Sequence, residues 1–276
     1  MSDAFNMDFI IVGAMKSGTT SLIHHLGRHP RICIPKSEVH FFENDANYRK
    51  GLGWYEGRIR RHQTEVTTVF GEKTTAYSFH EDAPARIRAA FPRARLVWIF
   101  REPVARAYSN YIHAYRMGAV RGSFEEAVEK EAERMKENRY SGYMARSRYA
   151  LQVKRYLEHF GKAQMHFMVF EHFIHHVKEE LDSLFDFIGV TSEGFELKDE
   201  PRGRAVMPRW PSSIYHARRL FGPGLLHRAV LFANTMFQKP GYDKLDPAYK
   251  AELKTRFTEE NAELAELTGL ELSAWA

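Results

Sequence analysis

The chain has 276 residues, of which 44% are hydrophobic and 27% are charged, and its formal net charge at pH 7 is +5. This composition is typical of a globular protein and excludes the disordered and fibrous classes. The positive charge suits an anionic ligand, but the basic residues are interspersed with acidic ones, so nucleic acid is not an expected partner.

The cysteine content and the N-terminal sequence indicate the cellular compartment. A single cysteine, Cys33, excludes an intrachain disulfide, which fits a reducing compartment. Its place between Ile32 and Ile34 predicts a small buried side chain rather than a reactive thiol. The N-terminus lacks the basic segment of a signal peptide, and no apolar run approaches the roughly 18 residues of a membrane span. We therefore expect a cytoplasmic protein without a membrane span.

Short apolar runs alternate with helical patterns along the chain. The apolar runs predict buried strands at residues 9–12, 67–70, 95–100 and 165–170. Helical spacing predicts helices at 20–29, 83–91, 104–115, 123–136, 149–160, 179–188 and 247–268, with Ser123 and Asp246 as N-caps. Such alternation is typical of a parallel sheet with helices on both faces. We expect a P-loop-like α/β fold in a single domain over residues 1–276.

Residues 193–224 interrupt this alternation. Prolines break regular structure, and a long irregular segment in a compact domain is often functional. We expect a loop or lid here, which contains Pro201, Pro208, Pro211 and Pro223 with Arg202, Arg204 and Arg209.

The segment Gly13-Ala-Met-Lys-Ser-Gly-Thr-Thr20 follows the first predicted strand and precedes the first predicted helix. Its glycines let successive backbone N–H groups point at an anion, and the helix N-terminus adds a partial positive charge. The nucleotide triphosphatase loop has the same glycine spacing, but here Thr19 stands where that loop has its lysine, and Lys16 lies inside the loop. The Lys16 ammonium can then approach the bridging oxygen of a bound anhydride and stabilise a departing group.

A second anion site is indicated at the end of the strand at 95–100. Arg101 follows this strand, and Ser109 lies two turns into the next predicted helix. Ligands of a doubly wound sheet bind at the carboxyl ends of its strands, where Gly13 and Arg101 both fall. An arginine and a hydroxyl at one edge of a crevice could hold a second phosphate, although a surface arginine with a capping serine would give the same pattern.

Together the two motifs resemble those of sulfotransferases that use 3′-phosphoadenosine 5′-phosphosulfate (PAPS). The first is similar to the family's 5′-phosphosulfate loop, and the second has the arginine-to-serine spacing of its 3′-phosphate motif. A basic-Gly-basic segment at 202–204 is similar to the loop that closes over the nucleotide. The resemblance implies PAPS as the donor, with the nucleotide held by Lys16, Ser17, Gly18, Thr19, Thr20, Ser21, Arg101, Ser109, Arg202, Gly203 and Arg204.

Within this family the chain resembles the heparan sulfate branch and its bacterial relatives. Segments 38–42, 51–55 and 72–77 look like parts of glycosaminoglycan 3-O-sulfotransferases, and 272–275 resembles the end of many bacterial members. Two features depart from that branch. Glu43 stands where those enzymes have an aspartate, and their C-terminal disulfide is excluded by the single cysteine. The resemblance therefore implies a carbohydrate hydroxyl as acceptor, with a small metabolite, a lipid, a carrier-bound hydroxyl or an amine as alternatives.

The resemblance also implies roles for the catalytic groups. Glu38 is the candidate base for the acceptor proton, and His40 is expected to assist or replace it, to orient the acceptor, or simply to pack. Lys73 is expected to donate to the sulfuryl oxygens, and Lys16 to stabilise the leaving oxygen. Positioning and electrostatics suffice for such a transfer. The histidines show no metal spacing, so we expect no metal.

Two other classes of function fit the sequence less well. A nucleotide kinase or triphosphatase predicts a lysine at position 19 and an aspartate at a strand end, where this chain has Thr19 and Arg101. A catalytically dead binding module would lack Lys16 and Glu38, which are present. The acceptor stays open, because one set of aromatic residues suits either a sugar groove or an apolar pocket: Phe41, Phe42, Trp54, Tyr55 and Tyr77.

Overall fold

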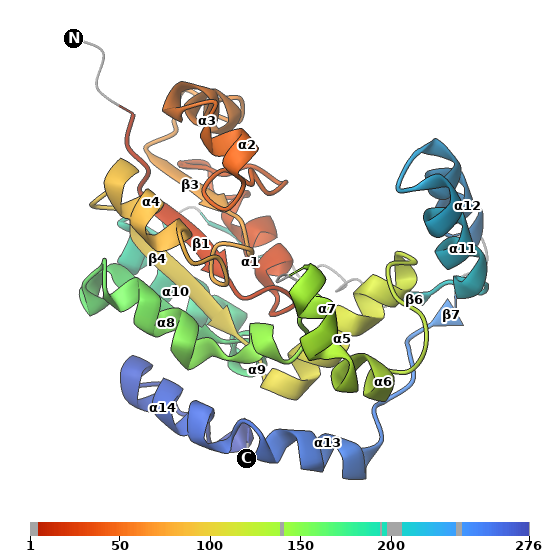
Figure 1. Ribbon diagram of the computed structural model, residues 1–276. Helices are drawn as coiled ribbons and strands as arrows, with labels where there is room; N and C mark the ends of the chain where they lie inside the picture. Colours follow the sequence, from red (N-terminus) through yellow and green to blue (C-terminus); the bar gives the residue numbers. More distant parts are fainter. Residues whose placement is uncertain (1–4, 139–140, 194, 198–205, 236–238, 276) are drawn as a thin grey trace. The chain divides into compact units, whose positions relative to one another are not determined.

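The computed structural model describes residues 5–138, 141–193, 195–197, 206–235 and 239–275 (Figure 1). The chain divides into two compact units. Unit 1 comprises residues 1–102, 148–198 and 258–276, and unit 2 comprises residues 103–147 and 199–257. Each unit has an apolar core of its own and is described separately.

Unit 1 is built on a parallel sheet. Its strands, in the part of the chain that the structure describes, follow the order β2-β3-β1-β4-β5, and every neighbouring pair is parallel. β1 is the central strand, with β3 on one side and β4 on the other. The loop after β1 therefore lies at the carboxyl edge of the sheet between these two strands, which is where ligands bind in such sheets. The strands are β1 (Phe9–Gly13), β2 (Ile32–Cys33), β3 (Val69–Lys73), β4 (Arg95–Phe100) and β5 (Met165–Val169).

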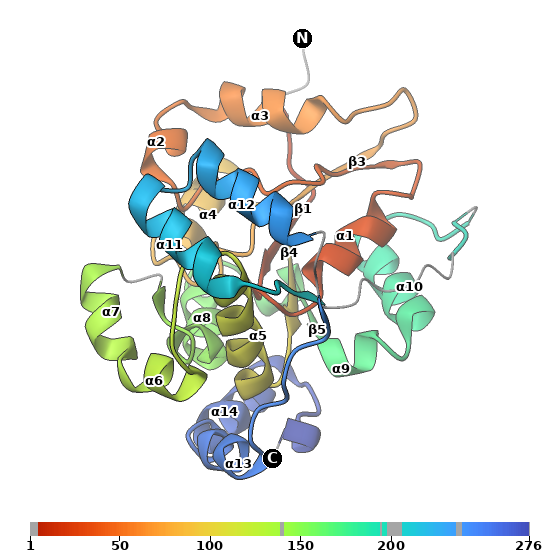
Figure 2. The same cartoon turned by 90° about the vertical axis from the view of Figure 1, so that its right-hand side faces the viewer.

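Both faces of this sheet are covered by helices (Figures 1 and 2). Successive residues of a strand point to opposite faces, so Ile10 packs with α3, α4, α8 and α14, whereas Phe9 packs with α1 and α10. This confirms the predicted fold class. The helices of unit 1 are α1 (Thr19–Leu26), α2 (Asp45–Tyr48), α3 (Leu52–Arg60), α4 (Ala83–Ala90), α8 (Tyr149–Leu157), α9 (Phe170–Phe173), α10 (Val177–Ile188) and α14 (Thr258–Thr268).

Unit 2 is mainly helical. Its core forms around α5, whose residues Val104, Ala107 and Tyr111 pack with Leu253 and Phe257. Residues 206–207 and 239–240 form a short antiparallel ladder. The elements are α5 (Pro103–Arg116), α6 (Phe124–Glu129), α7 (Glu131–Glu137), β6 (Val206–Met207), α11 (Pro211–Phe221), α12 (Leu225–Thr235), β7 (Lys239–Pro240) and α13 (Pro247–Thr255).

The structure corrects three of the predicted elements. The segment 193–224, predicted as a loop, contains β6 and α11, because Pro211 occupies the first helical turn, where its missing N–H costs nothing. The helix predicted at 247–268 is divided into α13 and α14, and the one at 123–136 into α6 and α7. The predicted caps are confirmed, since Ser123 and Asp246 accept backbone N–H bonds at the starts of α6 and α13.

Candidate functional site

The loop after β1 runs from Gly13 into the N-terminus of α1. The Ala14 N–H donates to the Ile99 carbonyl of β4 over 2.9 Å, so the loop is fixed to the neighbouring strand. Gly18 has a φ of 87°, a conformation that glycine adopts without strain, and the next residue begins α1. The N–H groups of the first helical turn therefore lie at the end of this loop, as an anion site requires.

The polar side chains of this loop differ in exposure. The Ser17 hydroxyl is fully buried and has no hydrogen-bond partner among the described residues. A buried hydroxyl without a partner costs free energy, so this one is poised for a ligand atom. Lys16 is half-buried and has a φ of 70°, and Thr19 is buried. Thr20 and Ser21 are exposed.

Arg101 connects the end of β4 to this loop. Its Nη1 donates to the Lys16 carbonyl over 3.2 Å, and its guanidinium lies 4.9 Å from the centre of the Phe170 ring. The same ring abuts Gly18, where an added Cβ would lie 2.6 Å from it. The first anion motif and the arginine of the second are thus in direct contact. Ser109 is half-buried in α5 and belongs to unit 2, while Arg202, Gly203 and Arg204 lie outside the described residues.

A carboxylate and an ammonium meet at the end of β3. Glu38 Oε1 lies 2.9 Å from Lys73 Nζ and accepts a 3.0 Å hydrogen bond from the Thr75 hydroxyl. Lys73 is only 8% exposed and Glu38 is 22% exposed, so the carboxylate is held by a buried cation and still faces solvent. Lys73 pairs in register with Ile11 of β1, two residues before Gly13, so this pair lies beside the loop.

His40 stands next to this pair. Its Nε2 lies 3.5 Å from Glu38 Oε2, and its Nδ1 lies 2.5 Å from Glu43 Oε1. The hydrogen bond with Glu43 is the main cause that raises the pKa of His40, and the negative charges of Glu43, Glu38 and Glu72 act in the same direction against partial burial. Its φ of 53° is unusual for a residue other than glycine. His40 is half-exposed and is not packed into the core.

Glu72 is a buried carboxyl that the sequence interpretation missed. It accepts hydrogen bonds from Tyr55 (2.9 Å) and Thr74 (3.1 Å), and burial raises its pKa to about 7. The Thr74 hydroxyl in turn accepts the backbone N–H groups of Val39 and His40. Glu72 thus supports the segment that carries Glu38. A glutamate inside a strand that is otherwise buried was the available signal.

The aromatic residues considered for the acceptor are mostly in the core. Phe41, Phe42, Tyr55 and Tyr77 are at most 1% exposed, so they line neither a sugar groove nor an open pocket. Trp54 is half-buried, with Lys50 Nζ 4.5 Å above its ring. Cys33 is buried, as predicted, and its Sγ donates to the Ile59 carbonyl.

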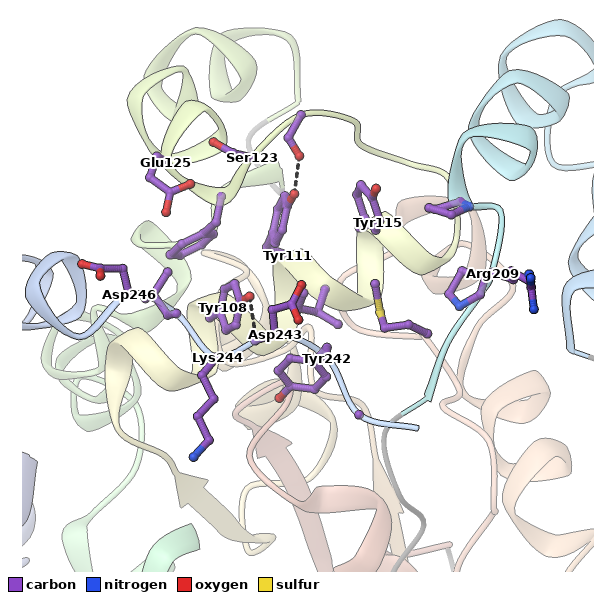
Figure 3. A pocket seen from close by; sticks show the side chains of 18 residues that line it. Tyr108, Tyr111, Tyr115, Ser123, Glu125, Arg209, Tyr242, Asp243, Lys244 and Asp246 are labelled. Atoms are coloured by element: carbon purple, nitrogen blue, oxygen red, sulfur yellow. Dashed lines mark hydrogen bonds between the residues drawn. The ribbon is translucent and has the colours of Figure 1, made fainter. Parts of the chain in front are cut away.

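Unit 2 has a cavity of about 640 Å³ between α5 and the segment 241–246 (Figure 3). Its wall includes the rings of Tyr108, Tyr111, Tyr115 and Tyr242. The Tyr108 hydroxyl donates to the Asp243 carbonyl over 2.7 Å, which fixes the 241–246 segment against α5. Rings with polar groups at their edges can hold a ligand that has flat apolar faces and hydroxyls.

No group of three or more histidine, cysteine, aspartate or glutamate side chains within the described ranges is arranged to hold a metal ion. Unit 1 instead brings together an anion loop, an arginine and a carboxylate–lysine pair. This arrangement can bind a polyanion and accept a proton beside it.

Comparison with known proteins places this arrangement in a family. The Sulfotransferase domain family matches residues 6–202. Mouse heparan sulfate glucosamine 3-O-sulfotransferase 3B1 is 34% identical over 188 residues, which cover 66% of this chain and 45% of the relative. The chain thus spans about half the length of the curated relatives it matches.

Solved structures agree with this match. A sulfotransferase from Alicyclobacillus acidocaldarius is 26% identical with a TM-score of 0.75, and the alignment covers 99% of each chain. Mouse sulfotransferase SULT7A1, solved with PAP, aligns over 97% of this chain and 88% of its own with a TM-score of 0.52, but its 14% identity shows the fold alone. Because the family covers well over half of the sequence and the fold agrees, the chain belongs to the sulfotransferase domain family.

Proposed function

We propose that this protein transfers a sulfuryl group from PAPS to a hydroxyl of a carbohydrate acceptor. The observation that carries the proposal is the position of the Glu38–Lys73 pair beside the anion loop, at the carboxyl ends of the neighbouring strands β3 and β1. A donor anhydride and a proton acceptor are the two requirements of sulfuryl transfer. This site can meet both.

The donor is assigned to the loop and to Arg101. The backbone N–H groups at the start of α1 and the hydroxyls of Ser17 and Thr19 suit the 5′-phosphosulfate, with Thr20 and Ser21 at the rim. Lys16 is assigned to the bridging oxygen, which gains negative charge as the bond to sulfur breaks. Arg101, together with Ser109 of the sequence motif, is assigned to the 3′-phosphate. Arg202, Gly203 and Arg204 are assigned to the nucleotide by resemblance alone.

The transfer step assigns the proton to Glu38. The acceptor hydroxyl gives its proton to the Glu38 carboxylate while its oxygen forms a bond to sulfur. The bond from sulfur to the 5′-phosphate oxygen breaks, and its electron pair leaves with 3′-phosphoadenosine 5′-phosphate. Lys73, which lies 2.9 Å from Glu38, can hold the carboxylate and donate to a sulfuryl oxygen as charge moves.

The surroundings of His40 favour Glu38 over His40 as the base. The raised pKa of His40 means that it keeps its proton to higher pH than an ordinary histidine. A protonated imidazole cannot accept the acceptor proton. His40 lies 3.5 Å from Glu38, where it can orient the carboxylate or an acceptor oxygen.

The carbohydrate acceptor rests on the named activity of the curated relatives. The test is a radiolabelled PAPS donor offered to a panel of glycans, lipids and small hydroxylated metabolites. Label on a glycan is the expected result. Label confined to a lipid or a small metabolite would overturn the carbohydrate assignment while keeping the reaction.

The donor assignment is tested by calorimetric titration with 3′-phosphoadenosine 5′-phosphate. We expect binding by the intact protein and an affinity about tenfold or more weaker for Lys16→Ala, because a charge-assisted contact is lost. Lys162→Ala is the matched control, since Lys162 is exposed just before β5, at the amino ends of the strands. Absence of binding by the unmodified protein would sink the assignment.

A further inference from the structure

Helices α11 and α12 form a hairpin whose second helix buries polar side chains. The α12 side chains that are buried are polar: His227 is 2% exposed and Asn234 is 4% exposed. His227 Nε2 lies 3.1 Å from the Met117 carbonyl, and Asn234 accepts the Trp210 N–H over 3.0 Å. Val230 and Leu231, which lie three and four residues after His227 on the same face, are half-buried.

Three other large apolar side chains of α12 are exposed. Leu225 is 82% exposed, Leu226 is 56% exposed and Phe232 is 71% exposed. The end of α11 continues this surface through Leu220 and Phe221, which are 73% and 58% exposed. A Gly-Pro-Gly turn at 222–224 joins the two helices at the end of the hairpin away from the β6–β7 ladder (Figure 1). We call the four side chains that flank this turn, Leu220, Phe221, Leu225 and Leu226, the apolar tip. Phe232 lies about two turns further along α12 and lines a cavity with Met117 and Pro208.

Contiguous exposure of this kind is costly in water and marks interaction sites. Outside the hairpin, the described residues form no second cluster of exposed large hydrophobic side chains. The chain's other strongly exposed large hydrophobic side chains are scattered over separate elements, as with Leu52 in α3, Val66 in a loop and Leu151 in α8. The apolar tip therefore fits a partner outside this chain.

Charge identifies the kind of partner. Residues 209–235 contain no aspartate or glutamate, although the whole chain has 35 such residues. The same stretch contains Arg209, Arg218, Arg219 and Arg228, of which Arg219 and Arg228 are exposed directly beside the apolar tip. Apolar side chains flanked by arginine, without acidic residues, match the interface of an anionic lipid bilayer.

We propose that the α11–α12 hairpin is a membrane-docking element, with the apolar tip inserted between the headgroups of an anionic bilayer and Arg219 and Arg228 on lipid phosphates. No helix within the described residues is both long and apolar enough to cross a membrane, and α12 has only 11 residues. The hairpin therefore lies in the interface and does not span it. This inference is independent of the proposed sulfuryl transfer.

Vesicle flotation tests the proposal with the full chain. We expect the protein to float with vesicles of phosphatidylcholine that contain about one-third phosphatidylglycerol. The fraction bound to vesicles of pure phosphatidylcholine should be lower by about tenfold or more. A double variant, Phe221→Glu with Leu225→Glu, should lose about tenfold or more of the bound fraction because two apolar side chains no longer enter the bilayer. Val66→Glu is the matched control and should float like the unmodified protein.

Arginine variants separate charge from apolar contact. Arg219→Glu with Arg228→Glu should abolish the preference for anionic vesicles, and Arg93→Glu, at an exposed site in unit 1, should not. Circular dichroism and thermal melting check that each variant is folded before its flotation is compared. The proposal is overturned if the unmodified protein does not float. It is also overturned if sedimentation without vesicles shows self-association that Phe221→Glu removes while flotation stays unchanged.

Site-specific fluorescence gives a second measurement. Because Cys33 is the chain's single cysteine and is buried, a Leu226→Cys variant accepts an environment-sensitive dye selectively at the apolar tip. We expect a blue shift and brighter emission on addition of anionic vesicles. A dye on Val66→Cys should show neither. Equal spectra at the two positions would contradict insertion.

Discussion

Glu72 lies in the buried core of unit 1 and is connected through Thr74 to the segment that carries His40. The carboxyl is fully buried, and the hydroxyl groups that donate to it include those of Tyr55 and Thr74. Thr74 passes this support on by accepting the N–H groups of Val39 and His40. Glu72 touches neither the anion loop nor Lys73 in any contact described above, so its effect on catalysis would be one of positioning.

The pKa of Glu72 predicts a pH dependence of stability. Its folded-state pKa is raised from 4.5 to about 7, so the folded protein binds this proton more tightly than the unfolded chain. The contribution to the free energy of unfolding is then full below pH 4.5 and is lost as the pH rises to 7, in total about 3 kcal/mol. Urea unfolding at several pH values should show this loss in the unmodified protein and not in Glu72→Gln. Equal pH profiles for the two proteins would contradict it.

Glu38→Gln tests the proposed base. The amide keeps the size of the side chain but cannot take a proton, so kcat should fall by about 100-fold to 10,000-fold. The affinity for 3′-phosphoadenosine 5′-phosphate should stay within about twofold, since Glu38 is not assigned to the nucleotide. Glu65→Gln, at an exposed turn, is the control. Near-native turnover of the Glu38 variant would remove it as the base.

The sequence anticipated those residues of the site that belong to short motifs. The loop at Gly13–Thr20, Arg101 and the Glu38–Lys73 pair were predicted from local pattern and resemblance, and the structure brings them together in unit 1. Glu72 was not predicted to matter, because its importance comes from burial and from partners 17 residues away, such as Tyr55. The aromatic set was misassigned for the same reason, since composition does not show which side of a segment is buried.

At the scale of elements, β1 and β3 pack closely because Gly71 has no side chain. Phe9 and Gly71 are partners in register, and the Phe9 ring occupies the space that a Cβ on Gly71 would need. Gly71→Ala should therefore destabilise the protein by about 1–3 kcal/mol through overpacking. Gly57→Ala should instead stabilise α3 by about 0.5–1 kcal/mol, because nothing lies within 4 Å of its added methyl group. Denaturant unfolding measures both, and a neutral Gly71 variant would refute the packing argument.

Elements with a strong local period were predicted well. β4 has the predicted bounds, and β1 and β5 differ from them by one residue. β2 has two residues, too few to show any period, and was missed. α12 was missed because its apolar residues do not form one stripe. Leu225 and Phe232 are exposed, whereas Leu231 is half-buried, so the pattern by which amphipathic helices are recognised is absent.

For the whole molecule, the net charge of +5 predicts faster capture of the anionic donor at low salt. Electrostatic attraction over more than a few ångströms is screened as the Debye length falls from about 10 Å at 0.1 M salt to about 3 Å at 1 M. The association rate constant for 3′-phosphoadenosine 5′-phosphate should fall by about tenfold over this range in stopped-flow experiments. A rate that does not change with salt would show that only local contacts matter.

The hydrogen bond from Arg101 to the Lys16 carbonyl makes the two ends of the nucleotide interdependent. A residue assigned to the 3′-phosphate also braces the backbone that is to receive the 5′-phosphosulfate, and it does so at a residue with positive φ. Loss of the guanidinium should then weaken both ends at once. Binding of the 3′-phosphate would in this way also affect the loop at the reacting end. An analogue without the 3′-phosphate would then be a poorer substrate for a reason beyond affinity.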